Sequence, residues 1–147
     1  MKIIQYPNPI LRQKCEKIKN PTDSAIQQLI LDMIKTMRAN DGAGLAAPQV
    51  GKNIQLCVME VDNEIFTLIN PEIKNLSGKD LFIEEGCLSF PGKFLPIKRC
   101  EKIKVKAYDN SGKKQIIRAR GLLARVFQHE IDHLNGELFI DKAVEYK

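Results

Sequence analysis

The sequence predicts an α+β fold in which antiparallel β-sheets pack around a central C-terminal helix, with a further helix near the N-terminus. Apolar residues recur at helical spacing near residue 30 and again after residue 120. The segment between them alternates apolar and polar residues, as half-buried strands do. A chain of 147 residues has the size of one domain, and it contains neither a repeat nor a low-complexity linker. Residues 1–147 are therefore expected to form a single domain.

The first expected helix lies within residues 21–41, PTDSAIQQLILDMIKTMRAND. Thr22, Asp23 or Ser24 is suited to cap its start, and the segment from Asn40 to Gly42 is suited to end it. One face of this helix is apolar and should be buried, because its residues follow the i, i+3, i+4 pattern. These residues are Ile26, Leu29, Ile30, Met33, Ile34 and Met37.

The middle of the chain is expected to form antiparallel hairpins. NIQLCVME and IFTLIN are short apolar runs joined by VDNE. Further on, EKIKVKAY alternates Ile103, Val105 and Ala107 with three lysines, before the turn DNSG and the run KKQIIRAR. Because successive side chains of a strand point to opposite faces, one face of these hairpins should be buried and the other in water.

A second helix, about residues 120–135, is expected to end at Asn135-Gly136, a pair suited to the left-handed position after a helix. It contains the only two histidines of the chain, His129 and His133, four residues apart, with Glu130 directly after the first. Glu130 falls near the middle of the apolar arc, where a carboxylate is costly without a charged partner. Two histidines at this spacing also occur as satisfied core residues, but H-E-x-x-H more specifically indicates a divalent metal.

A third metal ligand should come from another segment, because two imidazoles leave a four-coordinate ion in need of one more protein group and an open position for water. The four cysteines are widely spaced, have no C-x-x-C pair and are expected to be reduced thiols. Spacing does not choose among them. Local context favours Cys87, within IEEGCLSFPG, whereas Cys57 in LCVM, Cys15 and Cys100 are typical of small buried side chains.

The segment GAGLAAPQVG, residues 42–51, is expected to be a loop that can approach a peptide main chain closely. Pro48 restricts the backbone just before Gln49, whose amide can donate hydrogen bonds to a developing oxyanion. A purely structural Gly/Ala-rich turn is the alternative. The segment lacks the trailing lysine of a phosphate-binding loop, so a nucleotide site is not expected.

Composition limits the partners and the location. The net charge of +5 attracts polyanions, and a ribosome with its exposed RNA phosphates is a candidate partner, although scattered lysines also suit a solvated surface. No apolar run is long enough to span a bilayer, and the start MKIIQYPNPILRQK lacks the features of a signal peptide. The chain is therefore expected to act in the cytoplasm without a membrane.

Three segments together resemble the peptide deformylase family. They are GAGLAAPQ (42–49), EGCLS (85–89) and QHEIDH (128–133), in the order that this family shows. The likeness also includes DMIKTM in the first helix and the LNGELF segment, so it covers nearly the whole chain.

The resemblance implies a metal-dependent hydrolase that removes the formyl group from the N-terminal formylmethionine of newly synthesised proteins and releases formate. By similarity, Cys87, His129 and His133 hold one divalent ion, natively Fe²⁺, with Zn²⁺, Ni²⁺ or Co²⁺ also found. Glu130 would transfer the proton. Gln49 and the backbone N–H of Leu88 would stabilise the oxyanion.

The resemblance also implies how a formylmethionyl peptide is held. The peptide would lie extended along the glycine-rich loop and Gly86, like an added strand. Its methionine side chain would enter an apolar pocket, and Glu85 and Arg99 would form a supporting charged pair. The residues expected to contact substrate are Gly42, Ala43, Gly44, Leu45, Gly86, Leu122 and Val126.

Two departures from the family qualify this expectation. Ala43 stands where many relatives carry Val or Ile, which enlarges the methionine pocket slightly. The sequence ends eleven residues after Gly136, too soon for most of the helix with which some bacterial members dock on the ribosome. Docking is therefore expected to use distributed basic charge, and the enzyme is expected to be a monomer.

Two rival functions are considered. A metallopeptidase of the H-E-x-x-H type would take its third ligand from a later His or Glu, but the chain has no third histidine. A non-catalytic module that binds ribosomal RNA could use the Cys/His set as a structural zinc site. Such a site would require four protein ligands and no buried glutamate beside them.

Overall fold

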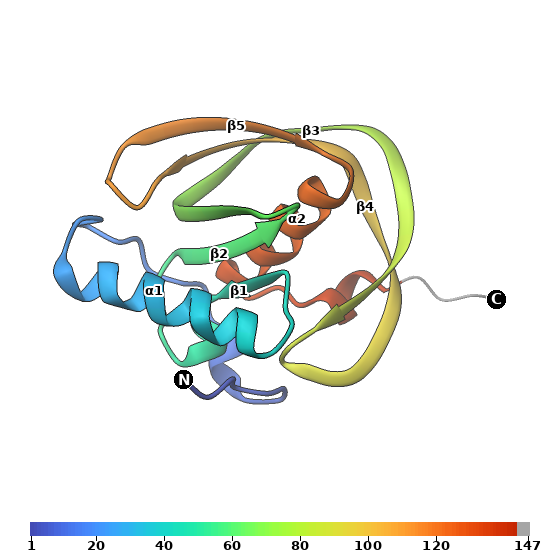
Figure 1. Cartoon of the computed structure of the whole chain (residues 1–147). Coiled ribbons are helices and arrows are strands. Elements are labelled where there is room, and N and C mark those ends of the chain that lie inside the picture. The colour runs from blue at the N-terminus through green and yellow to red at the C-terminus, as the bar shows by residue number, and fades with distance from the viewer. Residues whose placement is uncertain (144–147) are drawn as a thin grey trace.

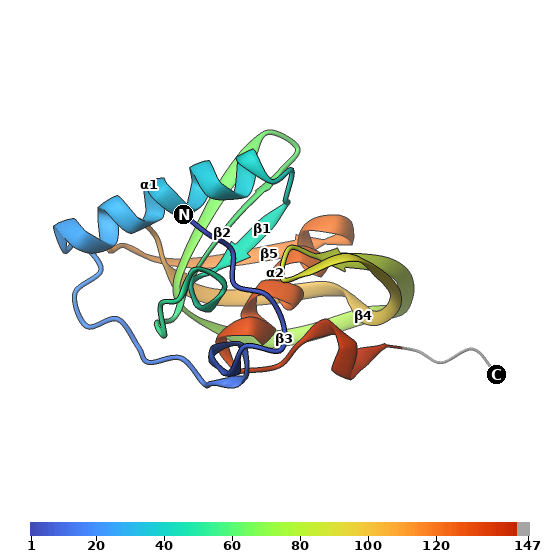
Figure 2. The same ribbon diagram turned by 90° about the horizontal axis from the view of Figure 1, so that it is seen from below.

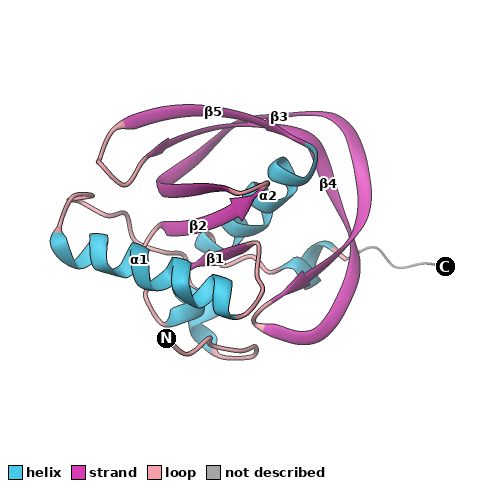
Figure 3. Cartoon of the chain, viewed as in Figure 1, coloured by secondary structure: helices cyan, strands magenta, loops and turns pink. Residues whose placement is uncertain are grey.

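The structure is a computed structural model that describes residues 1–143; residues 144–147, part of the expected single domain, lie outside this range. Within the described range the chain forms a five-stranded sheet and two α-helices, which confirms the α+β prediction (Figures 1 and 3). The elements are α1 (Ser24–Ala39), β1 (Gly44–Ala46), β2 (Leu56–Val61), β3 (Glu64–Cys87), β4 (Phe90–Tyr108), β5 (Lys114–Arg120) and α2 (Gly121–Leu134).

The strands form one antiparallel sheet in the order β1-β2-β3-β4-β5, rather than several sheets. The hairpins appear where the alternation predicts them, but β3 spans 24 residues and β4 spans 19, far longer than the short runs visible in the sequence. Their pairing shifts register between Ile69 and Glu72 and at three further places. Such bulges bend strands, and the sheet accordingly curls around α2 (Figure 1).

Helix α1 packs on the outside of β1 and β2, as Figure 2 shows. It begins as predicted, with the Asp23 side chain accepting a hydrogen bond from the backbone N–H of Ala25 at 2.8 Å. Of its expected apolar face, Ile26 and Ile34 are only partly buried. The remaining four residues are buried with the apolar side chains of the first two strands: Leu29, Ile30, Met33 and Met37.

Helix α2 lies inside the curl of the sheet and is the central element of the fold (Figure 1). Ten of its 14 residues are buried. Phe127 and Ile131 pack into the main core, and the helix ends as predicted before Gly136, whose φ of 73° is left-handed. Polar residues on its other side are buried too, which the helical pattern alone does not indicate.

The segment 42–51 is more regular than the expected loop. It contains β1, paired with β2, followed by a 3₁₀ helix at Ala47–Val50. The side-chain Oε1 of Gln49 accepts a hydrogen bond from the backbone N–H of Ala46 at 2.9 Å and so orders this turn. A three-residue strand is too short to show an alternating pattern, which is why the sequence suggested only a loop.

Among residues 1–143, neither helix is long and apolar enough to cross a bilayer.

Candidate metal centre and active site

Two elements bring a thiol and two imidazoles together. Cys87 is the last residue of β3, and His129 and His133 lie one turn apart on α2. Their potential ligand atoms all lie within 4.8 Å of one another, and Sγ of Cys87 is 3.4 Å from Nε2 of His133. Cys15 and Cys57 are buried in the core cluster that packs against α2, outside this group. The arrangement therefore singles out one of the four cysteines.

The chemistry of this donor set fits one divalent cation. Thiolate and neutral imidazole suit zinc, ferrous iron and neighbouring transition metals, and three protein ligands leave a position open. His133 is 1% exposed, and burial holds the pKa of His133 well below its usual range. A neutral His133 keeps a lone pair available for a metal at neutral pH.

Glu85 orients the second imidazole. Its Oε1 lies 2.8 Å from Nδ1 of His129, which leaves Nε2 of that ring facing the thiol side of the site. The same carboxylate accepts hydrogen bonds from Nε and Nη2 of Arg99, at 2.7 and 3.1 Å, and from Arg125. Burial would raise the pKa of Glu85, but the hydrogen bonds from His129 and Arg99 lower it to about 2. The charged pair expected from the resemblance is thus present.

The buried charge network is larger than the sequence suggested. Arg99 also donates from Nη1 to Asp132 at 2.8 Å, so two guanidinium groups and two carboxylates balance one another beside the imidazoles. On a helical wheel Arg125, Gln128 and Asp132 share the arc opposite the apolar one, which is the usual mark of a solvated face. All three are buried. Their i, i+3, i+7 spacing was a signal, but it shows only a shared face and not what covers it.

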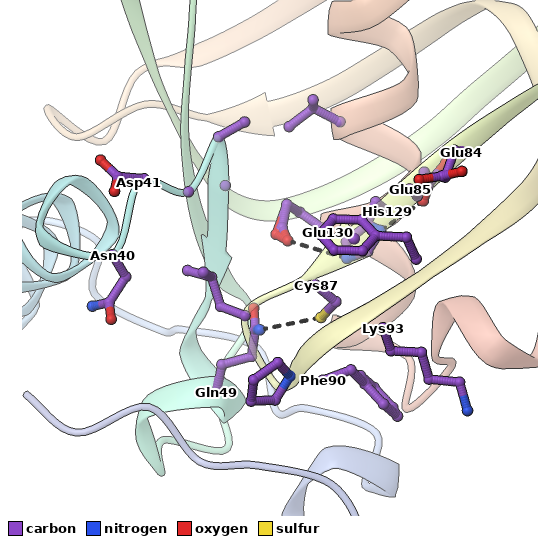
Figure 4. A pocket seen from close by; sticks show the side chains of 18 of the residues that line it. Asn40, Asp41, Gln49, Glu84, Glu85, Cys87, Phe90, Lys93, His129 and Glu130 are labelled. Atoms are coloured by element: carbon purple, nitrogen blue, oxygen red, sulfur yellow. Dashed lines mark hydrogen bonds and ion pairs between the residues drawn. The ribbon is translucent and has the colours of Figure 1, made fainter.

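Glu130 is a buried carboxylate beside the donor set (Figure 4). Its Oε1 lies 3.9 Å from Nε2 of His129, and its Oε2 has no hydrogen-bond partner among residues 1–143. Burial raises the pKa of Glu130 to about 7, against the opposing charges of His129 and Arg99. A carboxyl group with this pKa can take up and release a proton near neutral pH.

Gly44 is required for the position of Glu130. A Cβ added at residue 44 would lie 2.8 Å from Cγ, 2.9 Å from Cδ and 3.0 Å from Oε2 of this glutamate. The short strand β1 therefore passes directly against the carboxylate, and a side chain there would displace it.

Gln49, in the 3₁₀ helix Ala47–Val50, connects the glycine-rich segment to the turn between β3 and β4. Its side chain is 1% exposed, and Nε2 donates a hydrogen bond to Oγ of Ser89 at 3.0 Å. The same nitrogen makes a longer contact of 3.6 Å with Sγ of Cys87, drawn as a dashed line in Figure 4. Ser89 in turn donates to the backbone oxygen of Ile4 at 2.7 Å. Sequence reasoning missed Ser89, although it lies inside the EGCLS segment.

Gln49, Cys87, His129 and Glu130 line a cavity of about 600 Å³. The expected catalytic residues Gln49, Leu88 and Glu130 lie at its wall. Six of the seven expected substrate contacts lie there too: Gly42, Ala43, Gly44, Gly86, Leu122 and Val126. Leu122 is 61% exposed at the wall, whereas Val126 is buried. Leu45 differs from this expectation, because its side chain is fully buried in the core under α1 and does not line the cavity. Alternation along β1 explains this: its neighbours on either side face the other way.

Comparisons with known proteins agree with this geometry. The family model described as polypeptide deformylase matches residues 1–147. A peptide deformylase from Dictyoglomus thermophilum is 49% identical over 138 residues, which cover 94% of this chain and 89% of that protein. The crystal structure of a peptide deformylase from Thermotoga maritima superposes with a TM-score of 0.95 at 42% identity, covering 98% of this chain and 97% of that one. A peptide deformylase from Synechococcus elongatus, solved in complex with actinonin, superposes with a TM-score of 0.96 at 41% identity, covering 99% of this chain and 79% of that one.

Proposed function

Because this chain belongs to the polypeptide deformylase family, we propose that Cys87, His129 and His133 hold the metal ion with which it hydrolyses formylated peptides. It is a metal-dependent hydrolase that removes the formyl group from the N-terminal formylmethionine of newly made proteins and releases formate. The observation that carries the assignment of the site is the convergence of these three ligand atoms beside a buried carboxylate without a partner.

The metal is proposed to be Fe²⁺, with Zn²⁺, Ni²⁺ or Co²⁺ as functional substitutes. One thiolate and two imidazoles suit any of these ions, and the family resemblance favours iron. When bound, the ion would polarise the formyl carbonyl and lower the pKa of a water molecule. Glu85 supports the site by fixing the ring of His129.

Glu130 is the proposed acid and base of the reaction. It accepts a proton from the water that adds to the formyl carbon, and it returns this proton to the amine nitrogen when the carbon–nitrogen bond breaks. The products are formate and a free amino terminus. Burial raises the pKa of Glu130, which favours uptake of the proton from water. The absence of a hydrogen-bond partner for Oε2 among residues 1–143 leaves that oxygen available for them.

Gln49 and the backbone N–H of Leu88 are the proposed donors to the negative charge that develops on the formyl oxygen. An amide nitrogen carries two hydrogens. The one directed at Ser89 makes the shorter contact, at 3.0 Å, whereas the contact to the sulfur is 3.6 Å. The hydrogen directed at the sulfur is therefore the one that can be redirected to substrate.

Substrate binding is proposed to use the cavity wall. The methionine side chain would lie against Ala43, Leu122 and Val126. The peptide backbone would follow the backbone of residues 42–44 and Gly86. Leu45 can contribute only through its backbone, since its side chain is in the core. We further propose that the enzyme is a cytoplasmic monomer that meets its substrate at the ribosome.

The family relationship rules against the two rival functions. Among residues 1–143 the Cys87, His129 and His133 group contains three ligands rather than the four of a structural zinc site. Its proposed third ligand is the thiol of Cys87 from β3, not the later His or Glu of an H-E-x-x-H peptidase.

Hydrolysis of formyl-Met-Ala tests the proposal. Protein purified without oxygen and supplied with ferrous iron, or with nickel in air, should release formate, and acetyl-Met-Ala should serve as the control that is not cleaved. Cleavage of the Met-Ala bond would instead indicate a peptidase. If none of the four metals supported formate release, the assignment of the site would be refuted.

A further inference from the structure

The outer face of the sheet at β4 and β5 carries a concentration of positive charge. Alternation along β4 and β5 buries Ile103, Val105, Ala107 and Ala119 against the core. The intervening residues therefore point outward. We name as the basic sheet face the six outward cations of these two strands: Lys102, Lys104, Lys106, Lys114, Arg118 and Arg120.

The register places like charges directly opposite one another. Lys102 pairs with Arg120, and Lys104 pairs with Arg118, across the β4–β5 ladder. Like charges at opposed positions of a sheet repel each other. An anion with several negative charges, bound between the opposed pairs, would relieve this repulsion.

Few carboxylates neutralise this face. Glu101 contacts Arg120 at 3.3 Å, and Glu72, opposite Lys106, is paired with Lys74 at 2.8 Å. Within the part of the chain that the structure describes, the other five cations of the basic sheet face have no carboxylate oxygen within 4.0 Å. Their charge is therefore available to a partner.

The face is also hollowed. A groove of about 330 Å³ runs over the three strands, between β3 on one side and β5 on the other. Its β3 side offers neutral hydrogen-bonding groups, Asn75 and Ser77, which pair with Lys104 and Lys102. The groove therefore combines a double row of cations with amide and hydroxyl groups, the set of side chains with which proteins contact phosphate and sugar oxygens.

We propose that the basic sheet face binds the phosphate backbone of RNA. Outward residues repeat every ~7 Å along a strand, and neighbouring strands are ~5 Å apart, so the cations form two parallel rows that can follow a chain of phosphates. Among residues 1–143, no aromatic side chain lines the groove for bases to stack on, so binding should be independent of base sequence. Ile116 is the single large apolar side chain pointing outward from β5, which is too little to anchor a membrane surface.

This inference rests on the proposed function, because it is the nascent-chain substrate that makes RNA the expected polyanion. The chain joins the two sites closely. Arg120 ends the basic sheet face, and Leu122, two residues later, lines the cavity. Figure 1 shows β5 running directly into α2. An enzyme held by this face on ribosomal RNA would therefore keep its cavity near the RNA surface from which a new protein emerges.

A matched pair of variants tests the proposal. The groove variant carries Lys102→Gln, Lys104→Gln, Arg118→Gln and Arg120→Gln. The control carries Lys2→Gln, Lys14→Gln, Lys35→Gln and Lys52→Gln. These four lysines are exposed and lie outside β3–β5, and their substitution removes the same number of positive charges as in the groove variant. Binding of a short labelled RNA duplex is measured by fluorescence anisotropy over a range of salt concentrations. Formyl-Met-Ala hydrolysis and thermal melting are measured on the same samples.

The groove variant should lose RNA affinity about tenfold or more at low salt, and its log–log salt slope should be smaller by about 3. The control variant should change affinity by less than about threefold. A further variant with Lys102→Arg and Lys104→Arg should keep the affinity. Both Gln variants should hydrolyse the dipeptide like the parent, so a failure of the proposed function would appear as absent formate release in every sample.

Three outcomes would overturn the proposal. Equal losses in the two Gln variants would show attraction by net charge alone. RNA binding that survives in the groove variant would place the RNA contact elsewhere. The parent could also bind phosphatidylglycerol vesicles more tightly than RNA. If the groove variant lost this vesicle binding, the face would be assigned to a membrane surface instead.

Discussion

Oε1 of Glu85 lies 2.8 Å from Nδ1 of His129, so a buried carboxylate at the end of β3 determines which nitrogen of the ring faces Cys87. The same carboxylate is the meeting point of Arg99 and Arg125. One side chain therefore links the position of a proposed metal ligand to the charge balance of the core.

Glu85→Gln should weaken metal binding about 10- to 100-fold, because the neutral amide holds the imidazole less firmly. It should also lower the free energy of unfolding by about 3–5 kcal/mol, since two buried arginines lose a charged partner. Metal titration and urea unfolding measure the two effects. The neighbouring Glu84→Gln, at an exposed position, is the matched control and should change neither. Unchanged metal affinity in Glu85→Gln would refute the positioning role.

Glu130→Gln should retain the bound metal and lose about 10²- to 10⁴-fold in turnover, because an amide cannot accept the proton. Metal content by mass spectrometry and formate release are the measurements. Loss of metal from this variant would show instead that Glu130 is a ligand.

Cys87→Ala should abolish metal retention, because the thiol is one of only three proposed ligands. Cys57→Ala, a buried thiol outside the group, should keep the metal and lower the free energy of unfolding by about 1–2 kcal/mol. Dialysis against a weak chelator followed by metal analysis compares the two. Similar metal loss in both variants would contradict the choice of Cys87.

Gly44→Ala should lower turnover about 100-fold while the metal stays bound, because the new methyl group would displace the Glu130 carboxylate. The turnover number, metal content and melting temperature separate this effect from a loss of folding. A turnover number equal to that of the parent would mean that the contact between β1 and Glu130 has no part in the reaction.

Thiol reactivity should follow burial. Burial raises the pKa of Cys15 to about 11 and raises the pKa of Cys57 well above its usual value. A raised thiol pKa means less thiolate at a given pH, so at pH 8 both should react with iodoacetamide far more slowly than Cys100, which is only partly buried. The rate at Cys15 should rise as the pH approaches 11. Peptide mass spectrometry after timed labelling measures this order, and rapid labelling of Cys57 in the folded protein would contradict it.

The helices and hairpins could be predicted from the sequence because their signals are local. The apolar spacing of α1 and the alternation of Ile103, Val105 and Ala107 extend over a few residues and appear in the structure where they were expected. The His129–Glu130–His133 triplet is equally local, because one helical turn places both imidazoles on one side without help from the rest of the fold.

Other features depend on how distant segments meet. The sequence alone did not show that Asp132 and Arg125 are buried, since a polar arc indicates only a shared face and the covering strands come from residues far away. Leu45 entered the core because β1 pairs with β2, and its three residues carry no readable alternation. Likewise, lysines and arginines scattered along the sequence became one basic sheet face through the β4–β5 register. The sequence by itself determined the local elements and the helical half of the site; tertiary structure decided burial, strand register and the approach of Cys87, because these depend on contacts between residues distant in the chain.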